Sequence, residues 1–335
     1  MSPAPGLSDR PLAVLGGGTM GSQIAVVLAF SGQDVRLWVR DAAKIDATRR
    51  RVDLVMAQLV DNGLCSPTDT EAAAGRLSIR TSLSEAVADA GFVIEAIAED
   101  LAAKQDVLRL AETVCDPTTV LSSTTSALNA SEIGAALENP GRFVIAHFAQ
   151  PAHLVDVVEV VAGASTSEQT VDAVNGLLAG LGKRPVRCPD IPGFLWARIQ
   201  HAILREFVSL VEQGHATPAD CDLILKAGLA SRLPAMGSFE HADLAGLDLI
   251  SGPAAQAVWA DLSNASNPAD TLIGKLVLEG RLGMKTGEGF YDWTIRDPDE
   301  FKRTRDEEIV RRSQINREKL TAAAGHSVSA GRAAT

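Results

Sequence analysis

The sequence GGGTMG at Gly16–Gly21 decides the fold of the first half of the chain. It follows the apolar run Pro11–Leu15 and opens Ser22–Ser31, where apolar residues recur at helical spacing, and we expect Asp34–Val39 to form a second strand. Strand, glycine turn, helix and strand in this order predict a βαβ unit. Glycines in such a turn let the backbone approach a pyrophosphate at the positive end of the helix dipole. The pattern therefore predicts a dinucleotide site made by Gly16, Gly18, Thr19, Met20 and Gly21.

Further apolar runs alternate with helical segments: Leu77–Arg80, Phe92–Glu95, Thr119–Leu121 and Phe143–Ala146. This alternation predicts an α/β fold of Rossmann type, with a mostly parallel sheet covered by helices on both faces. At Cys188–Gly193 two prolines and a glycine interrupt the chain, and the pattern becomes helical from Phe194. We therefore expect a dinucleotide-binding domain at residues 1–188, an all-helical domain at 189–320 and a flexible tail at 321–335.

The composition limits the classes of partner. The 335 residues carry a formal net charge of −11, and 46% are hydrophobic against 22% charged, as in an ordinary globular protein. This balance argues against nucleic acid or an anionic membrane as a partner and favours a small molecule. No apolar run approaches the roughly eighteen residues of a membrane span and no signal peptide is evident, so we expect a cytoplasmic protein. The cysteines have no metal-ligand or disulfide spacing, and we interpret them as reduced and mostly buried: Cys65, Cys115, Cys188 and Cys221.

The end of the second predicted strand bears on the choice of cofactor. NAD-binding units usually place an Asp or Glu there, which accepts hydrogen bonds from the adenosine ribose. Here the position holds Val39, and the guanidinium of the next residue, Arg40, would attract a 2′-phosphate. The alternative is that Arg40 is a solvated loop residue and Asp41 accepts from the ribose. The sequence favours NADP(H) over NAD(H).

A histidine and a glutamate form the candidate catalytic pair. His147 ends one apolar run, and Glu159 lies within a second, valine-rich run after a proline turn. Two strands joined in this way can bring an imidazole and a carboxylate together, as a dehydrogenase needs when a base takes the hydroxyl proton. A glutamate buried among valines is costly unless it is paired, and here it would hold the ring tautomer and stabilise the imidazolium. The alternative is a structural histidine at a strand end.

Five motifs in order make the chain resemble the 3-hydroxyacyl-CoA dehydrogenase family from about residue 11 to residue 293. Gly16–Gly21 resembles its GxGxMG turn, and His147–Pro151 its HFxNP motif. Glu159 stands where the family has its LVEV glutamate, Pro192–Phe194 matches its PGF, and Leu282–Trp293 is close to its closing LGxKTGKGFYD. The resemblance implies interconversion of a β-hydroxy and a β-keto acyl compound, free or carrier-bound, and a homodimer formed through the helical domain.

The resemblance also implies three further site residues. Ser126 aligns with a serine that hydrogen-bonds the substrate oxygen, and Glu99 and Lys104 match a glutamate and a lysine near the nicotinamide and the substrate. Each has a plainer alternative: Ser126 as a polar turn or helix cap, and the two charged residues as ordinary charges at a helix start.

Two positions depart from the family pattern. Ala197 replaces an asparagine that donates a hydrogen bond near the substrate carbonyl, a loss worth about 1–3 kcal/mol, and Gln150 replaces the asparagine of HFxNP. Trp196 beside Ala197 offers a flat apolar wall. These changes raise two alternatives: an NADPH-dependent biosynthetic ketoreductase for a larger, polyketide-like β-keto substrate, and a largely non-catalytic, crystallin-like homologue that binds dinucleotide.

Four cations between residues 41 and 74 bear on recognition of coenzyme A. Lys44 and the run Arg49–Arg51 lie in a region that the family uses to help hold the nucleotide end of CoA. The alternative is that these cations form a solvated helix face.

Overall fold

A computed structural model describes Leu7 and residues 10–332 of the chain, with side chains as far as Ile315. The chain forms two compact units, the first made of residues 1–198 and 306–313 and the second of residues 199–305 and 314–335. The first unit thus extends past the expected end at residue 188. The reason is packing, because Phe194 is fully buried in the core of that unit.

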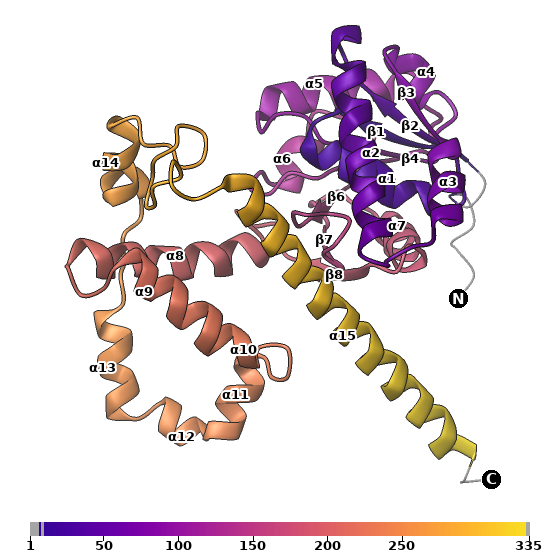
Figure 1. The fold of residues 1–335 in the computed structure, drawn as a ribbon. Coiled ribbons are helices and arrows are strands. Elements are labelled where there is room, and N and C mark those ends of the chain that lie inside the picture. The colour runs from indigo at the N-terminus through magenta and orange to yellow at the C-terminus, as the bar shows by residue number, and fades with distance from the viewer. Residues whose placement is uncertain (1–6, 8–9, 333–335) are drawn as a thin grey trace. The chain divides into compact units, whose positions relative to one another are not determined.

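The first unit is built on one twisted sheet (Figure 1), which has eight strands in the described residues. The strands are β1 Leu12–Leu15, β2 Val35–Trp38, β3 Leu77–Arg80, β4 Phe92–Glu95, β5 Val120–Ser123, β6 Phe143–Phe148, β7 Val157–Val161 and β8 Arg184–Cys188. They lie in the order β3-β2-β1-β4-β5-β6-β7-β8, and neighbours are parallel except β6 and β7, which are antiparallel. The predicted α/β, Rossmann-type fold is confirmed.

Helices and short turns connect the strands. They are α1 Thr19–Ala29, η1 Ala42–Lys44, α2 Ile45–Asp61, α3 Pro67–Arg76, α4 Leu83–Val87, α5 Leu101–Glu112, α6 Ala130–Gly134, η2 Pro140–Arg142 and α7 Glu168–Gly180. The strand β1 shows how the sheet serves two cores. Leu12 and Val14 belong to one apolar cluster and Ala13 and Leu15 to the other, because successive side chains of a strand point to opposite faces. An entirely apolar strand is therefore required at this place.

The second unit is helical in its described residues, which confirms the predicted helical C-terminal domain. Its elements are α8 Trp196–Glu212, which begins in the first unit, α9 Pro218–Leu223, the π-helix η3 Ile224–Leu229, α10 Ala230–Arg232, α11 Ser238–Ala245, α12 Leu247–Ile250, α13 Pro253–Asp261, η4 Pro268–Asp270, α14 Leu272–Leu278 and part of α15 Pro298–Arg332. Among the described residues no helix is both long enough and apolar enough to cross a bilayer.

The helix α15 belongs in part to the first unit, through residues 306–313. Val310 is 4% exposed within the first core, and Ile309 packs against the same cluster. Gln58 of α2 donates a hydrogen bond to Asp306 (2.8 Å). The helical backbone of α15 continues to Arg332, and residues 333–335 lie outside the described residues, so the flexible tail expected at residues 321–335 stays a prediction.

Candidate functional site

The glycine turn between β1 and α1 is shaped by two close approaches. Gly16 has a φ of +122°, and a Cβ there would lie 2.6 Å from the carbonyl oxygen of Ala96. A Cβ on Gly21 would lie 1.8 Å from the carbonyl oxygen of Gly16, so only glycine lets α1 begin this close to β1. A Cβ on Gly18 would meet nothing within 4 Å. The turn is thus closed on its protein side and open at Gly18, on the side where a ligand can approach.

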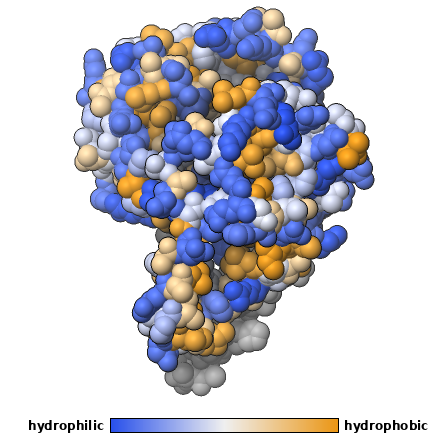
Figure 2. All heavy atoms as spheres, turned by 90° about the vertical axis from the view of Figure 1, so that its left-hand side faces the viewer, coloured by the Kyte–Doolittle hydropathy of each residue, from blue (hydrophilic) through white to orange (hydrophobic). Residues whose placement is uncertain are grey.

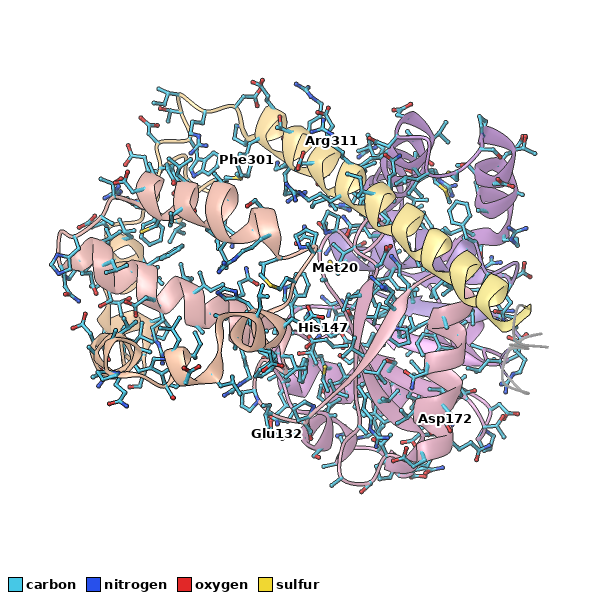
Figure 3. All side chains as sticks on the ribbon, turned by 90° about the horizontal axis from the view of Figure 1, so that it is seen from below. Met20, Glu132, His147, Asp172, Phe301 and Arg311 are labelled. Atoms are coloured by element: carbon cyan, nitrogen blue, oxygen red, sulfur yellow. The ribbon has the colours of Figure 1, made fainter. Side chains whose placement is uncertain are left out.

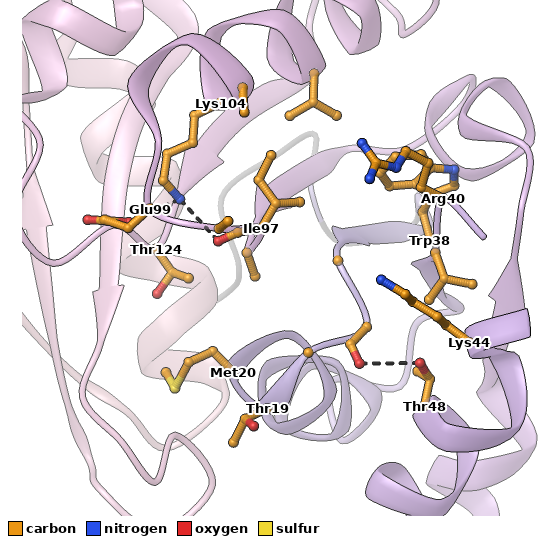
Figure 4. Close-up of a pocket in the computed structure, with 18 of the residues that line it drawn as sticks. Thr19, Met20, Trp38, Arg40, Lys44, Thr48, Ile97, Glu99, Lys104 and Thr124 are labelled. Atoms are coloured by element: carbon orange, nitrogen blue, oxygen red, sulfur yellow. Dashed lines mark hydrogen bonds and ion pairs between the residues drawn. The ribbon is translucent and has the colours of Figure 1, made fainter. Parts of the chain in front are cut away.

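A large pocket opens beside this turn, at the carboxyl ends of the parallel strands, where α/β proteins bind their ligands. Its volume is about 1120 Å³. Figure 4 shows part of its lining, and Figure 3 labels two of the lining residues, Met20 and His147. The residues predicted from sequence that line it are Gly16, Gly18, Thr19, Met20, Arg40, Glu99, Lys104, Ser126 and His147. Gly21 and Glu159 stand behind this lining.

His147 and Glu159 are paired by the register of the sheet. They lie directly opposite each other on the antiparallel strands β6 and β7, and His147 Nδ1 is 2.7 Å from Glu159 Oε2. Both are buried, with 7% and 3% of their surfaces exposed. The other carboxylate oxygen, Oε1, accepts hydrogen bonds from the backbone N–H groups of Leu195 (2.8 Å) and Trp196 (2.9 Å) and from the thiol of Cys188 (3.4 Å). Both carboxylate oxygens of Glu159 therefore have hydrogen-bond partners, which fix the orientation of the side chain.

The charge state of Glu159 follows from these contacts. Burial alone would raise its pKa, but the hydrogen bond with His147 and those from the Trp196 and Leu195 backbone outweigh burial and hold the pKa below its usual range. The carboxylate is therefore ionised near neutral pH, and His147 carries its hydrogen on Nδ1 to meet it. Burial, followed by the charge of Glu159, raises the pKa of Cys188 to about 12, so this thiol stays a neutral donor.

A buried ion pair lies beneath the pocket between β4 and α5. Lys104, only 1% exposed, donates to both carboxylate oxygens of Glu95 at 2.8 and 3.0 Å, and Glu95 has no exposed surface. Ser123 donates to the same carboxylate at 2.6 Å. Glu95 was not among the residues predicted from sequence, although it ends the apolar run Phe92–Glu95, as costly a place for an unpaired carboxylate as the valine run around Glu159.

Lys104 also connects to the loop that carries Ser126. Its ammonium lies 3.3 Å from Glu99, and Glu99 accepts hydrogen bonds from the Thr125 hydroxyl and from the Ser126 backbone N–H (3.2 Å). Burial would raise the pKa of Glu99, but the hydrogen bond from Thr125 and the charge of Lys104 lower it below its usual value. The Ser126 side chain is exposed at the pocket wall. Lys104 thus acts on the pocket through Glu99 as well as lining it.

The segment after β2 brings cations, and no carboxylate, to the pocket wall. Val39 is buried, and Asp41 does not line the pocket, because its side chain accepts the Ala43 N–H at the start of η1 (2.9 Å). Arg40 and Lys44 do line it, and Figure 4 shows their charged ends directed toward its open centre. The alternative in which Asp41 accepts from a ribose therefore has no support in this geometry.

Both units match one protein family. Residues 11–191 match the NAD binding domain of 3-hydroxyacyl-CoA dehydrogenase, and residues 193–293 match the C-terminal domain of the same enzyme. The probable 3-hydroxybutyryl-CoA dehydrogenase of Bacillus subtilis is 34% identical over 284 residues, which cover 85% of this chain and 97% of that protein. The 5-formyl-3-hydroxy-2-methylpyridine 4-carboxylate 5-dehydrogenase of Mesorhizobium japonicum is 32% identical over 286 residues, covering 85% and 91%.

Solved structures agree with these matches. A crystal structure of a 5-formyl-3-hydroxy-2-methylpyridine 4-carboxylic acid 5-dehydrogenase, described as an NAD⁺-dependent dismutase, superposes with a TM-score of 0.85 at 30% identity, covering 92% of this chain and 99% of that one. The (S)-3-hydroxybutyryl-CoA dehydrogenase of Ralstonia eutropha superposes with a TM-score of 0.69 at 27% identity, covering 85% and 99%. The chain therefore belongs to the 3-hydroxyacyl-CoA dehydrogenase family and is an oxidoreductase of that type, with a nicotinamide dinucleotide-binding first domain.

Proposed function

We propose that this enzyme interconverts a β-hydroxy and a β-keto acyl compound, with His147 as the general acid and base. The observation that carries the proposal is the buried contact between His147 and the ionised Glu159, beside a pocket that also presents the glycine turn. An imidazole that faces a ligand pocket and is held by a carboxylate is the arrangement that moves a proton to or from a substrate oxygen.

The pocket fits a dinucleotide. Gly18 leaves open space where a pyrophosphate would approach the first turn of α1, and Thr19 and Met20 continue this wall. The volume of about 1120 Å³ exceeds the roughly 300–1,000 Å³ of pockets for drug-sized ligands. When bound, the nicotinamide group supplies or accepts the hydride of the reaction.

Residues of the chain carry out the proton transfer and orient the substrate. His147, engaged by Glu159 at Nδ1, exchanges the substrate hydroxyl proton at Nε2. Glu159 fixes the ring orientation and balances the imidazolium charge in the oxidation direction. Ser126 donates a hydrogen bond to the substrate oxygen, and Glu99, fixed by Lys104, holds the backbone of Ser126 in place.

We further propose that NADP(H) is preferred to NAD(H). Arg40 lines the pocket at the end of β2, where Val39 stands in place of the carboxylate that recognises a ribose diol. A guanidinium there favours a 2′-phosphate through charge-assisted hydrogen bonds.

The test follows the loss of reduced-cofactor absorbance on adding acetoacetyl-CoA, with NADH and NADPH in parallel. His147→Ala should lower kcat by roughly 10²–10⁴-fold while nucleotide binding is retained. Glu159→Gln should lower it by roughly 10²-fold or more, and His215→Ala, which changes an exposed histidine of the second unit, should leave it unchanged. Undiminished turnover in His147→Ala would overturn the mechanism.

A second candidate function is oxidation or reduction of a larger, ring-bearing carbonyl compound, including the ketoreductase reaction on a polyketide-like substrate. It is favoured by Ala197, which lacks the donor that the acyl-CoA reaction uses, and by the match to the pyridine carboxylate dehydrogenase over 92% of this chain. Turnover of 5-formyl-3-hydroxy-2-methylpyridine 4-carboxylate or an aromatic β-keto acid, without turnover of acetoacetyl-CoA, would select it. Tight nucleotide binding with no turnover of any of these would select the crystallin-like, non-catalytic alternative.

A further inference from the structure

Three cationic side chains gather on one wall of the pocket, on the segment that follows β2. Arg40, Lys44 and Arg51 all line the pocket and all are exposed. In the described part of the chain none of the three forms an ion pair with an acidic side chain. The acidic residues of the same pocket, Glu99 and Asp106, come instead from the segment after β4. The wall beside β2 is therefore a positively charged surface without a protein counter-charge.

This wall is fixed to the glycine turn. Lys44 precedes α2, and Thr48 and Arg51 follow it at spacings of four and seven residues, which place all three on one face of a helix. The Thr48 hydroxyl and an Arg51 guanidinium N–H both donate to the carbonyl oxygen of Gly17, at 3.2 and 3.3 Å. Figure 4 shows Thr48 bound to the turn, with Lys44 above it. The cations are thus anchored at the end of the pocket where β2 meets the glycine turn.

The position between this wall and the turn carries no charged side chain. A Cβ on Gly17 would lie 2.5 Å from both the Val39 Cγ1 and the Thr48 Oγ1, so these two side chains fill the place beside the turn. Asp41 is occupied at the start of η1 and does not line the pocket. A ribose at this end therefore meets methyl groups, one hydroxyl and three cations, and no carboxylate to accept from a 2′,3′-diol.

We propose that Lys44 and Arg51 complete, with Arg40, the site of the adenosine 2′-phosphate of NADP(H). The inference rests on the proposed function, which places an adenine dinucleotide in this pocket. A phosphate monoester carries up to two negative charges and three acceptor oxygens, and two guanidinium forks with an ammonium match it by charge and hydrogen bonding. Cofactor preference is thus set by three residues on α2 and the segment before it, and not by Arg40 alone.

The 3′-phosphate of coenzyme A has the same chemistry, but this site favours the 2′-phosphate. The cations share one continuous pocket with the glycine turn and His147. A CoA 3′-phosphate held by the same three cations would therefore lie in the space that the proposed function assigns to the adenosine of the dinucleotide.

The test measures the binding of half-cofactors to the full-length protein by calorimetry, with no turnover required. We expect 2′,5′-ADP to bind at least roughly tenfold more tightly than 5′-AMP or 3′,5′-ADP. Equal affinity for 2′,5′-ADP and 5′-AMP would overturn the proposal. Preference for 3′,5′-ADP would also overturn it, and would assign the cations to coenzyme A.

Variants test the residues one at a time. Lys44→Met and Arg51→Gln should each weaken 2′,5′-ADP binding roughly tenfold and leave 5′-AMP binding unchanged. Arg49→Met and Arg50→Met are matched controls, because these neighbours on α2 are exposed and do not line the pocket. If the controls weaken 2′,5′-ADP binding as much as the two variants, the effect is one of overall charge and the site is wrongly placed.

The two proposals can fail separately. His147→Ala should bind 2′,5′-ADP as the unchanged protein does, because His147 lies on β6 and the cations follow β2. If the unsubstituted protein binds 2′,5′-ADP no more tightly than 5′-AMP but turns over the ketone with NADH, the phosphate site is overturned and the proposed chemistry stays intact. If the protein prefers 2′,5′-ADP to 5′-AMP but turns over no ketone, the proposed chemistry is overturned and the phosphate site stays.

Discussion

At the scale of single residues, the acid sensitivity of this enzyme should depend on Glu159. The pKa of Glu159 lies below its ordinary value of 4.5 in the folded protein. Its stabilising contribution is therefore present above about pH 4.5 and is lost as the pH falls through the lower folded value. Glu159→Gln should lower the thermal midpoint at pH 7 and flatten the decline of that midpoint between pH 5 and about pH 3.

Glu168→Gln is the matched control for this experiment. The pKa of Glu168 is also lowered, by its hydrogen bond with Arg187, but this pair is exposed to solvent and contributes little to stability. Melting curves recorded by circular dichroism across the acid range compare the two variants. An equally steep acid decline in Glu159→Gln would show that the buried carboxylate is not the group responsible.

The cysteines should differ in reactivity because the thiolate is the reacting form. All four are free thiols, but Cys188 is buried against Glu159 and its pKa is raised to about 12. At pH 8, iodoacetamide should modify the partly exposed Cys65 in the native protein and leave Cys188 unmodified. Peptide mass spectrometry measures both sites in one sample. Modification of Cys188 at the rate of Cys65 would mean that the thiol does not sit against the carboxylate.

At the scale of elements, the junction of β1 with α1 makes different demands on two glycines. Gly21→Ala places a methyl group 1.8 Å from a backbone oxygen and should destabilise the first unit by about 2 kcal/mol or more. Gly18→Ala meets no protein atom within 4 Å, so it should keep the melting temperature but weaken nucleotide binding. Thermal melting with and without NADPH separates the two effects. A stable Gly21→Ala protein would show that α1 can shift away from the turn.

The helix α15 should stabilise the first unit although it lies beyond the family match, which ends at residue 293. Val310→Ala removes buried methyl groups from the core and should cost about 2 kcal/mol. Arg311→Ala, at the next and exposed position, should change stability by less than about 0.5 kcal/mol. The readout is the melting transition that shifts on adding NADPH, since that transition belongs to the nucleotide-binding unit. Equal effects of the two variants would mean that α15 does not contribute to that core.

At the scale of the whole molecule, the second unit exposes several large apolar side chains, and contiguous exposed apolar surface is typical of interaction sites. Phe239 and Leu278 are each 90% exposed and Trp259 is 74% exposed, and Figure 2 shows hydrophobic patches among the hydrophilic residues of one face of the molecule. We propose that these residues are covered in a homodimer formed through the helical unit. Light scattering should then give a mass of about 70 kDa, twice the chain mass of 35.2 kDa.

Charged substitutions test this dimer. Phe239→Asp combined with Leu278→Asp should shift the protein toward the mass of one chain, because a buried interface cannot accommodate unpaired carboxylates. Leu54→Asp is the control, since Leu54 is an exposed leucine on α2 of the first unit. A single-chain mass for the unsubstituted protein at micromolar concentration would exclude the dimer.

The sequence by itself determined the features that depend on residues close together in the chain. The βαβ unit, the glycine turn and the missing carboxylate at Val39 depend on spacings within one short segment, and the pairing of His147 with Glu159 could be predicted because one proline turn joins their strands. In each case local backbone geometry leaves few alternatives.

Only the tertiary structure decided the contacts between distant segments. The strand β8 was not predicted, because this edge strand is mostly exposed and contains two arginines and a proline, so it carries little apolar signal. The tertiary structure also decided the burial of Glu95 against Lys104, the capping role of Asp41 and the place of Val310 in the core of the first unit. The physical reason is that a charge or an apolar side chain is satisfied by whatever the fold brings beside it, and this depends on strand order and helix packing across the whole chain.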